Sequence, residues 1–424
     1  MHHTIANWPD RASKTSNIFA NFKNNNITTL EEMPGTDANL QLIFSNCNIK
    51  YLNTGLFESA VNVKYVDLSH NLLENDQLGG DVFKGPYNVT DFRPIALEYL
   101  NLAYNNLHSL QKNMFQHIPY LKVLNLEGNH FRVLDHVTAF SFSYLPNLQS
   151  LSLAHNQLTE IPIDVLKNLK GNLTDLNLAL NDLDFVPSSL AYVYKTLQIL
   201  NISGNPIIEF NNKSFEGLVN LLKLYANNLT ELTSVTAYAF AHLKKLQVLS
   251  LSENPKLFEI DEDAFIGTTN LQELYMESNS LLHVSYKLLP SWSSLRVLNL
   301  KGNRFYCDCD LYNISQQLNE DIKRNGDGPY CLDAKAFTSR EVYTLKDNAC
   351  GMWPLEDSTS KSVFHKSMTL MRIVLMLMMA LLIISTAMAV WLAVMKWKTY
   401  NRSLNYPFPN QVVYNPVSTY DARY

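Results

Sequence analysis

The stretch that most constrains this chain is Leu97–Leu110, LEYLNLAYNNLHSL, which reads L-x-x-L-x-L-x-x-N-x-L-x-x-L. Leu100 and Leu102 flank Asn101, and this alternation predicts a short strand with one buried face. Asn105 follows the strand, where its amide is expected to turn inward and satisfy backbone groups. One such unit cannot bury its own leucines, so copies of it must stack beside it.

Twelve copies of this unit can be aligned along the chain. They recur every 22 to 27 residues, apart from one step of 34 between Asn71 and Asn105. Residues 74–94, rich in glycine and proline, fill that step and are expected to form a loop. The repeats favour a solenoid over a helical protein with chance matches. The positions aligned with Asn105 are Asn25, Cys47, Asn71, Asn129, Asn156, Asn181, Asn205, Asn227, Asn254, Asn279 and Asn303.

A second periodicity lies 10 to 13 residues after these positions, where phenylalanine recurs. Leu166 and Leu289 take its place in two units. These side chains are expected to stack as core on the convex side, without a functional role. The phenylalanines are Phe57, Phe115, Phe140, Phe215, Phe240 and Phe265.

Four cysteines follow the last repeat: Cys307, Cys309, Cys331 and Cys350. Spacing leaves three pairings open, and the alternative, a zinc site, has no common motif with this spacing. The cluster favours disulfides in an oxidising compartment. The pattern resembles the C-terminal cap of extracellular leucine-rich-repeat proteins such as Toll-like receptors, Slit and the Nogo receptor. That resemblance implies an α/β horseshoe with a parallel concave sheet, and the bonds Cys307–Cys331 and Cys309–Cys350.

The N-terminal segment, residues 1–16, departs from that family and is expected to be unstructured. Family members usually carry a signal peptide and a cysteine-rich N-terminal cap, whereas MHHTIANWPDRASK has no long apolar core. The first repeat would then end in an open edge. We therefore expect the natural chain to start further upstream. The repeats are expected over 17–305 and the cap over 306–351.

A membrane span is predicted at Ile373–Met395, which is 23 residues without a charge and long enough to cross a bilayer as a helix. A stalk at 352–372 would precede it and a cytoplasmic tail at 396–424 would follow. Candidate glycosylation sites favour extracellular repeats on a single-pass plasma-membrane protein. The alternative is a tail-anchored protein with cytosolic repeats. The sites before the span are Asn26, Asn88, Asn172, Asn201, Asn212, Asn228 and Asn313.

The tail is too short for a Toll-type signalling domain. Tyr414 and Val417 bound the sequence YNPV, which resembles an endocytic sorting signal. Tyr414 and Tyr420 are also phosphorylation candidates, which SH2-type adaptors would bind. An inert tail is the alternative. Small residues in the predicted span suit either a dimer contact or an ordinary helix face, namely Ser385, Ala389 and Ala393.

Tyrosines on the concave strip are the candidate ligand contacts. One patch contains Tyr65, Tyr99 and Tyr104, and another contains Tyr225 and Tyr275. Tyrosine buries a large area while losing little side-chain entropy, which suits binding sites. The alternative is that tyrosine merely suits strands.

Other residues of this strip can be assigned by the same alternation. Glu273 and Glu277 form an acidic pair around Tyr275, and a glycan at Asn201 would obstruct the centre of the concave face. The residues expected between two buried strand positions are Asp67, Asn101, Asn125, Ser152, Asn177, Asn201, Lys223, Ser250, Tyr275 and Asn299.

The distribution of histidines and the net charge of the chain indicate its functional class. The histidines are scattered without a recurring acid or nucleophile partner, so we predict neither an enzyme nor a cofactor. A net charge of −5 without a basic stripe argues against nucleic acid. We therefore predict a cell-surface receptor or adhesion protein that binds a protein ligand, with a tail-anchored intracellular scaffold as the alternative.

Overall fold

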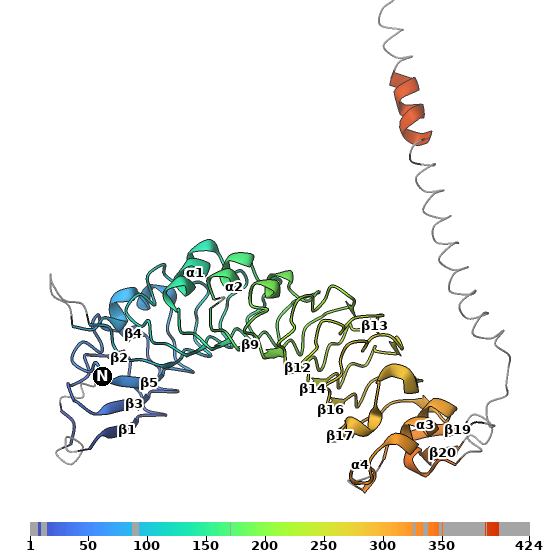
Figure 1. Cartoon of the computed structure of the whole chain (residues 1–424). Coiled ribbons are helices and arrows are strands. Elements are labelled where there is room, and N and C mark those ends of the chain that lie inside the picture. The colour runs from blue at the N-terminus through green and yellow to red at the C-terminus, as the bar shows by residue number, and fades with distance from the viewer. Residues whose placement is uncertain are drawn as a thin grey trace, which may run out of the picture. The chain divides into compact units, whose positions relative to one another are not determined.

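The computed structural model describes residues 7–9, 15–86, 93–169, 171–324, 328–333, 338–346, 350, 386 and 388–397. The chain divides into two compact units, Met1–Trp353 and Pro354–Tyr424. The repeats of the first unit follow one another in an arc, with the strands on its inner side (Figure 1).

A parallel sheet lines the concave side, and twelve strands form it among the described residues. Each strand is three to five residues long and buries at least one residue against the core. The expected repeat solenoid is therefore confirmed. In sheet order the strands are β1 (Asn17–Asn21), β3 (Asn39–Ile43), β5 (Val63–Asp67), β6 (Tyr99–Asn101), β7 (Val123–Asn125), β8 (Ser150–Ser152), β9 (Asp175–Asn177), β10 (Ile199–Asn201), β12 (Lys223–Tyr225), β14 (Val248–Ser250), β16 (Glu273–Tyr275) and β17 (Val297–Asn299).

Buried asparagines join most of the repeats to the one before. Asn105 Oδ1 accepts the N–H of Leu73 at 3.1 Å, and its Nδ2 donates to the carbonyls of Leu68 and Leu102. The side chain thus satisfies backbone groups of two repeats at once. The same bond to the preceding repeat is made by Asn71, Asn129, Asn156, Asn181, Asn205, Asn254, Asn279 and Asn303.

Cys47 occupies this position in the second repeat and makes the equivalent bond with its thiol. Its Sγ donates to the carbonyl of Phe22 at 2.9 Å, as Asn71 Nδ2 does to Phe44. Burial raises the pKa of the Cys47 thiol, which keeps the proton that this bond requires.

The ninth repeat corrects the predicted alignment. Leu224 lies opposite Leu200 in the sheet, so Ala226 is the second buried strand residue and Leu229 takes the asparagine position. Asn254 confirms this register, because its Oδ1 accepts the N–H of Leu229 at 2.7 Å. The prediction of Asn227 at this position is wrong, because a small alanine replaces a leucine and hides the alternation.

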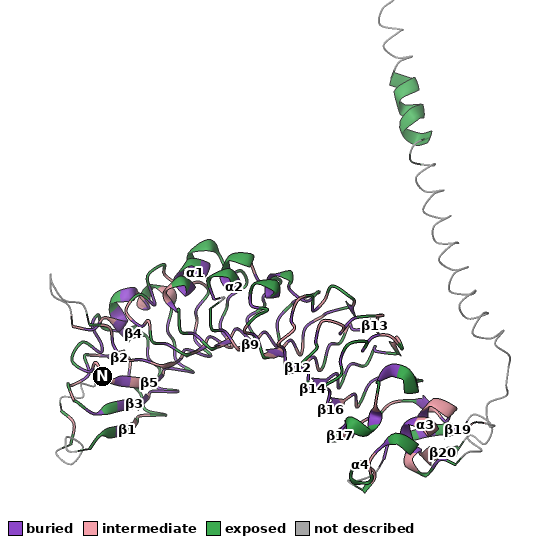
Figure 2. Cartoon of the chain, viewed as in Figure 1, coloured by how far each residue is buried: buried purple, intermediate pink, exposed green. Residues whose placement is uncertain are grey.

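Short strands and helical turns cover the convex side (Figure 1). Figure 2 shows the buried residues between these segments and the sheet. The strands are β2 (Thr29–Leu30), β4 (Tyr51–Leu52), β11 (Glu209–Phe210), β13 (Ser234–Val235) and β15 (Glu259–Ile260). The helices are α1 (His136–Ser141), α2 (Ile163–Asn168), η2 (Asn75–Gln77), η3 (Gly80–Phe83), η4 (Phe142–Tyr144), η5 (Ser188–Tyr192), η6 (Tyr286–Leu288) and η7 (Trp292–Ser294).

The expected stack of phenylalanines is present, but at one position a different phenylalanine from the predicted one is buried. Phe215, Phe240 and Phe265 are buried and pack in sequence, with centroids 5.7 and 4.9 Å apart. Phe140 is 42% exposed, and the prediction that it lies in the core is wrong. Phe142 takes its place, because α1 begins at the Asp135 cap and directs Phe142 inward against the core.

The insertion at residues 74–94, which was expected to be a loop, is only partly a loop. Its first half contains η2 and η3, and Phe83 is fully buried against Phe57, with ring centroids 6.2 Å apart. Asn75 fastens η2 to the next repeat, because its Oδ1 accepts the N–H of His108 at 3.0 Å. The insertion therefore adds to the core.

The C-terminal cap packs on the last repeats. Cys307 is bonded to Cys331, and Cys309 to Cys350, which are the pairs that the family resemblance implies. The elements are β18 (Phe305–Tyr306), α3 (Cys309–Gln317), α4 (Glu320–Arg324), β19 (Tyr330–Asp333), β20 (Thr338–Glu341) and η8 (Val342–Thr344).

His283 joins the cap to the repeats. Its Nδ1 lies 2.6 Å from Asp308 Oδ2 and its Nε2 lies 3.0 Å from Asp310 Oδ2. The hydrogen bond to Asp308, followed by that to Asp310, raises the pKa of His283 to about 9. The imidazolium therefore bridges two carboxylates at the start of α3 at neutral pH.

In the second unit, residues 388–397 are helical. Within the part of the chain that is described, no helix is both long and apolar enough to cross a membrane. Most of the predicted span at 373–395, the stalk at 352–372, Tyr414, Val417 and Tyr420 lie outside the described residues.

Candidate functional site: the concave face

Two columns of side chains point outward from the concave sheet. The residue just before the central buried residue of each strand belongs to a row that we call the first column. The residue just after it belongs to the middle column, so called because it lies between two buried positions. Tyr65 and Tyr99 belong to the first column. The middle column contains Asn21, Ile43, Asp67, Asn101, Asn125, Ser152, Asn177, Asn201, Tyr225, Ser250, Tyr275 and Asn299. Lys223 was expected in the middle column but lies in the first, because the register of the ninth repeat differs.

Tyr65 and Tyr99 lie side by side on β5 and β6. Their rings are stacked, with centroids 4.1 Å apart and an interplanar angle of 9°. Burial raises the pKa of the Tyr65 hydroxyl, and the hydrogen bond with Tyr99 adds to that rise. Both side chains remain partly exposed, so they present a rigid apolar surface with polar tips.

Tyr104 lies in a different structural position, the turn residue just before the buried asparagine. This residue has a positive φ, between 51° and 70°, in every repeat. The fixed conformation aligns the turn N–H with the next repeat, as when Tyr104 N donates to Glu127 O at 2.7 Å. The turn residues are Asn24, Asn46, His70, Tyr104, Gly128, His155, Leu180, Gly204, Asn228, Glu253, Ser278 and Gly302.

The Tyr104 ring is held by its neighbours along this row. It stacks on His70 at 4.5 Å and meets His155 edge-on at 6.2 Å. Gly128 lies between them, and a Cβ atom there would overlap the Tyr104 ring. The hydroxyl donates to Glu127 Oε1 at 2.9 Å. The predicted first patch is thus a Tyr65–Tyr99 pair plus a His70–Tyr104–His155 row.

The second predicted patch lies on the C-terminal repeats. Tyr225 and Tyr275 share the middle column, with Ser250 between them. The Tyr275 hydroxyl donates to Glu273 Oε2 at 3.1 Å. Burial, followed by this hydrogen bond, raises the pKa of Tyr275.

The candidate glycosylation sites are distributed over several surfaces. Asn201 lies in the middle column, and its Oδ1 accepts the N–H of Ser203 at 3.1 Å. Asn228 is a turn residue and Asn313 lies in α3. Asn26 and Asn212 are exposed, whereas Asn88 lies outside the described residues.

Asn172 also belongs to a second set of asparagines, which the leucine and asparagine pattern of the repeats does not predict. Its Nδ2 donates to the carbonyl of Pro146 at 2.8 Å, one repeat earlier. The signal is an asparagine just before a buried leucine, as in the sequences PNL and GNL. Equivalent bonds are made by Asn62, which precedes the buried Val63, and by Asn147, Asn220 and Asn270.

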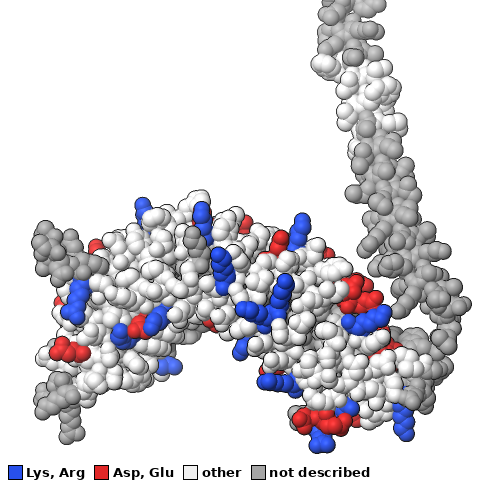
Figure 3. Space-filling view, viewed as in Figure 1, with Lys and Arg blue, Asp and Glu red and all other residues white. Residues whose placement is uncertain are grey.

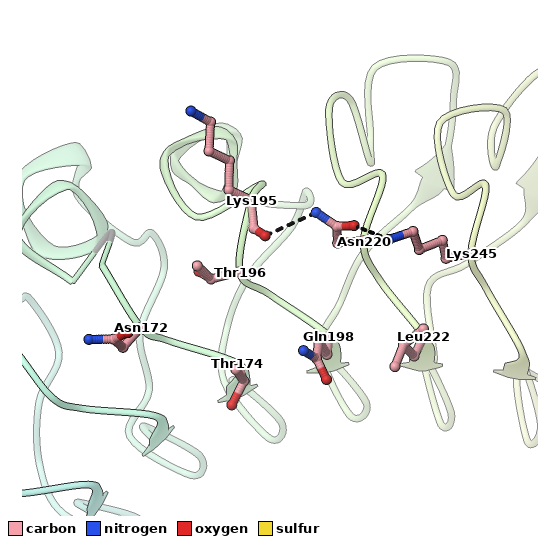
Figure 4. Close-up of a pocket in the computed structure, with 8 residues that line it drawn as sticks. All are labelled: Asn172, Thr174, Lys195, Thr196, Gln198, Asn220, Leu222 and Lys245. Atoms are coloured by element: carbon pink, nitrogen blue, oxygen red, sulfur yellow. Dashed lines mark hydrogen bonds between the residues drawn. The ribbon is translucent and has the colours of Figure 1, made fainter.

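A shallow polar pocket of about 340 Å³ lies along this row. Asn220 donates to the carbonyl of Lys195 at 2.9 Å, and Lys245 Nζ donates to Asn220 Oδ1 at 2.7 Å (Figure 4). Figure 3 shows basic side chains gathered over the middle repeats. Among the described residues, no group of three or more histidine, cysteine, aspartate or glutamate side chains is arranged to hold a metal ion.

Comparison with known protein families identifies the repeat. Family models described as leucine-rich repeat match residues 92–131, 226–281 and 147–169. Chicken (Gallus gallus) Tsukushi is 29% identical over 57% of this chain and 69% of its own length. Mouse (Mus musculus) lumican is 31% identical over 62% of this chain and 72% of its own length.

Comparison with solved structures supports the same architecture. The structure of the Drosophila Toll–Spatzle complex matches 69% of this chain at a TM-score of 0.53 and 22% identity. This chain spans 44% of the length of that Toll–Spatzle chain. At this identity the match establishes the fold alone.

Proposed function

The chain belongs to the leucine-rich-repeat family, and on that premise we propose that it is a cell-surface receptor or adhesion protein. Its ligand is a folded protein bound on the concave face. The sheet of twelve strands presents a surface roughly 50 Å long, which suits a protein better than a small molecule. The Toll structure with a similar fold is a complex with a protein, Spatzle.

The observation that carries this proposal is the stacked pair of Tyr65 and Tyr99. Two aromatic rings 4.1 Å apart are already ordered, so a ligand that covers them loses little side-chain entropy. Tyr104, fixed between His70 and His155, extends this surface toward the turns. These three tyrosines are therefore the proposed primary contact.

An extracellular position of the repeats agrees with the two bonded cysteine pairs of the cap, because disulfides persist in oxidising compartments. The predicted span at 373–395 would anchor the repeats in the plasma membrane. Adaptors would bind Tyr414, Val417 or Tyr420 in the tail, and the small residues of the span would support a dimer. The alternative is the tail-anchored scaffold, which would keep the repeats in the cytosol.

Endoglycosidase treatment of the full chain separates these two topologies. A cell-surface protein is expected to shift to a lower mass, and non-reducing mass analysis is expected to find both cysteine pairs. An unshifted band together with four free thiols at Cys307, Cys309, Cys331 and Cys350 would establish the cytosolic scaffold instead.

The proposed contact is tested by replacing its tyrosines in the full chain displayed on cells. The cells are screened against recombinant extracellular proteins, and hits are measured again with Tyr65, Tyr99 and Tyr104 changed to alanine. We expect binding to fall at least tenfold at unchanged surface level, since aromatic anchors dominate interfaces. The matched control changes three exposed tyrosines elsewhere, Tyr51, Tyr120 and Tyr192. Equal binding by both variants would exclude the patch.

A further inference from the structure

An acidic and aromatic cluster occupies the C-terminal part of the concave face. It consists of Tyr225, Glu273, Tyr275 and Glu277, and we call it the acid–tyrosine cluster. Glu273, Tyr275 and Glu277 alternate along one repeat, so their side chains share a face. Tyr225 shares the middle column with Tyr275, two strands away, and only the small side chain of Ser250 separates them.

Two oxygens, one in this cluster and one beside it, have no hydrogen-bond partner. Glu277 Oε2 is buried without a partner, although the residue as a whole is partly exposed. Ser252 is 5% exposed, and its Oγ is also without a partner. The two residues occupy matching positions in adjacent repeats, where Glu253 N donates to Glu277 O at 2.8 Å. A carboxylate oxygen accepts hydrogen bonds and a serine hydroxyl both donates and accepts, so these two side chains have hydrogen-bonding capacity that is not used.

The surrounding charges favour a cationic donor. Three carboxylates, Glu253, Glu273 and Glu277, lie in adjacent repeats. Cations on the same outward-facing rows are Lys223, in the first column two strands from Glu273, and Lys301, at the position matching Glu277 one repeat later. Among the described residues neither lysine forms an ion pair within 4.0 Å. The carboxylates therefore keep a net negative charge toward the concave face.

We propose that the acid–tyrosine cluster binds an arginine side chain of a protein partner, with the guanidinium on the Tyr225 and Tyr275 rings and its N–H groups donated to Glu273 and Glu277. Arginine fits because its planar group stacks on aromatic rings and carries five donors in a fixed fork. Lysine offers a compact charge without that plane. The inference rests on the proposed function only in taking the partner to be a protein.

The direct test uses the purified full chain and three labelled peptides of otherwise identical sequence. At three positions, one peptide has arginine, the second has lysine and the third has citrulline, the neutral analogue of arginine. Fluorescence anisotropy measures their dissociation constants. We expect the arginine peptide to bind severalfold more tightly than the lysine peptide, and the citrulline peptide at least tenfold more weakly than the arginine peptide. Equal affinity for the arginine and lysine peptides would show only non-specific electrostatic attraction and would overturn the proposal. Undetectable binding of the arginine peptide would also overturn it.

Matched variants locate the binding site. Glu273→Gln with Glu277→Gln is expected to weaken arginine-peptide binding at least tenfold, because hydrogen bonds to charged groups are lost. Glu216→Gln with Glu259→Gln removes the same charge from exposed positions away from the concave sheet and is expected to change binding less than twofold. Equal losses in the two double variants would overturn the proposal.

A third variant, Tyr225→Ala, keeps all carboxylates and is expected to remove the preference for arginine over lysine. Thermal unfolding checks that each variant folds. The outcome is independent of the Tyr65, Tyr99 and Tyr104 test, so a failure of the arginine site would leave the proposed ligand surface at the other end of the sheet intact.

Discussion

Asn71 Oδ1 accepts a hydrogen bond from the backbone N–H of Cys47 at 3.0 Å, across the boundary between two repeats. It accepts a second from Ile49 at the same distance. Through Nδ2 the same side chain donates to the carbonyls of Phe44 and Leu68 at 2.9 Å. One buried amide thus satisfies four backbone groups that would otherwise be without partners in the core.

Replacing Asn71 with alanine is expected to destabilise the repeats by about 3 kcal/mol or more, since each buried group left without a partner costs roughly 1–3 kcal/mol. The free energy of unfolding in urea measures the loss. Asn53→Ala, at an exposed position, is the control and should change the free energy by less than about 0.5 kcal/mol. Similar values for both variants would refute the role assigned to the Asn71 amide.

Gly128→Ala should impair both stability and ligand binding. Gly128 has a φ of 65°, which costs an alanine about 1–2 kcal/mol, and the added Cβ would displace the Tyr104 ring. We expect a lower melting temperature and severalfold weaker binding of any protein that contacts Tyr104. Gly171→Ala has neither constraint and should leave binding unchanged. If Gly128→Ala bound as the unmodified chain does, Tyr104 would not be a contact.

His283 is expected to make the stability of the cap depend on pH. Its pKa is raised to about 9 in the folded chain, against about 6.5 when unfolded. The stabilisation is therefore complete below about pH 6.5 and is lost as the pH rises through 9. Because His283 is 51% exposed, solvent screening limits the contribution to about 1 kcal/mol.

Urea unfolding at pH 6 and pH 9 should show this loss in the unmodified chain and not in His283→Gln. His136→Gln is the control, because His136 also faces a carboxylate, that of Asp164, but is 95% exposed. A pH dependence that survived in His283→Gln would assign it to other groups.

A glycan on Asn201 would divide the concave face, because Asn201 shares the middle column with Asn177 and Tyr225. Asn201→Gln is therefore expected to reduce the mass by one glycan and to increase the association rate of a ligand that spans both tyrosine patches. Asn212→Gln removes a site on an exposed loop and should lower the mass without changing the rate. Unchanged mass in Asn201→Gln would show that the site is unoccupied.

The sequence predicted the scaffold well because its period is repeated in leucine and asparagine. The prediction was wrong where two nearby residues of similar type could each occupy the same position of the repeat. Ala226 replaced a leucine and shifted the assignment of the ninth repeat, and Phe140 and Phe142 lie two residues apart, so only the start of α1 decides which is buried.

Other features had no sequence signal. Tyrosine, leucine and glutamate rarely adopt a positive φ, yet Tyr104, Leu180 and Glu253 do so, because the backbone hydrogen bonds between repeats impose this conformation. Ser252 and Glu277 are ordinary polar residues, and their lack of partners appears only when the neighbouring repeats are in place. The tyrosines could be assigned to the concave face, whereas their contacts with His70, His155 and Glu273 could not.

Leu229 has a consequence for how the solenoid opens. A leucine side chain has no oxygen that could accept the N–H of Ile207. The bonds from buried asparagines that run from Asn71 to Asn205 are therefore interrupted there and resume between Leu229 and Asn254. At this boundary Ser203 Oγ accepts the N–H of Asn227 instead. Repeat arrays open at their weakest interface. We therefore expect the solenoid to open first at Leu229, and partial unfolding should release one tyrosine patch while the other stays folded.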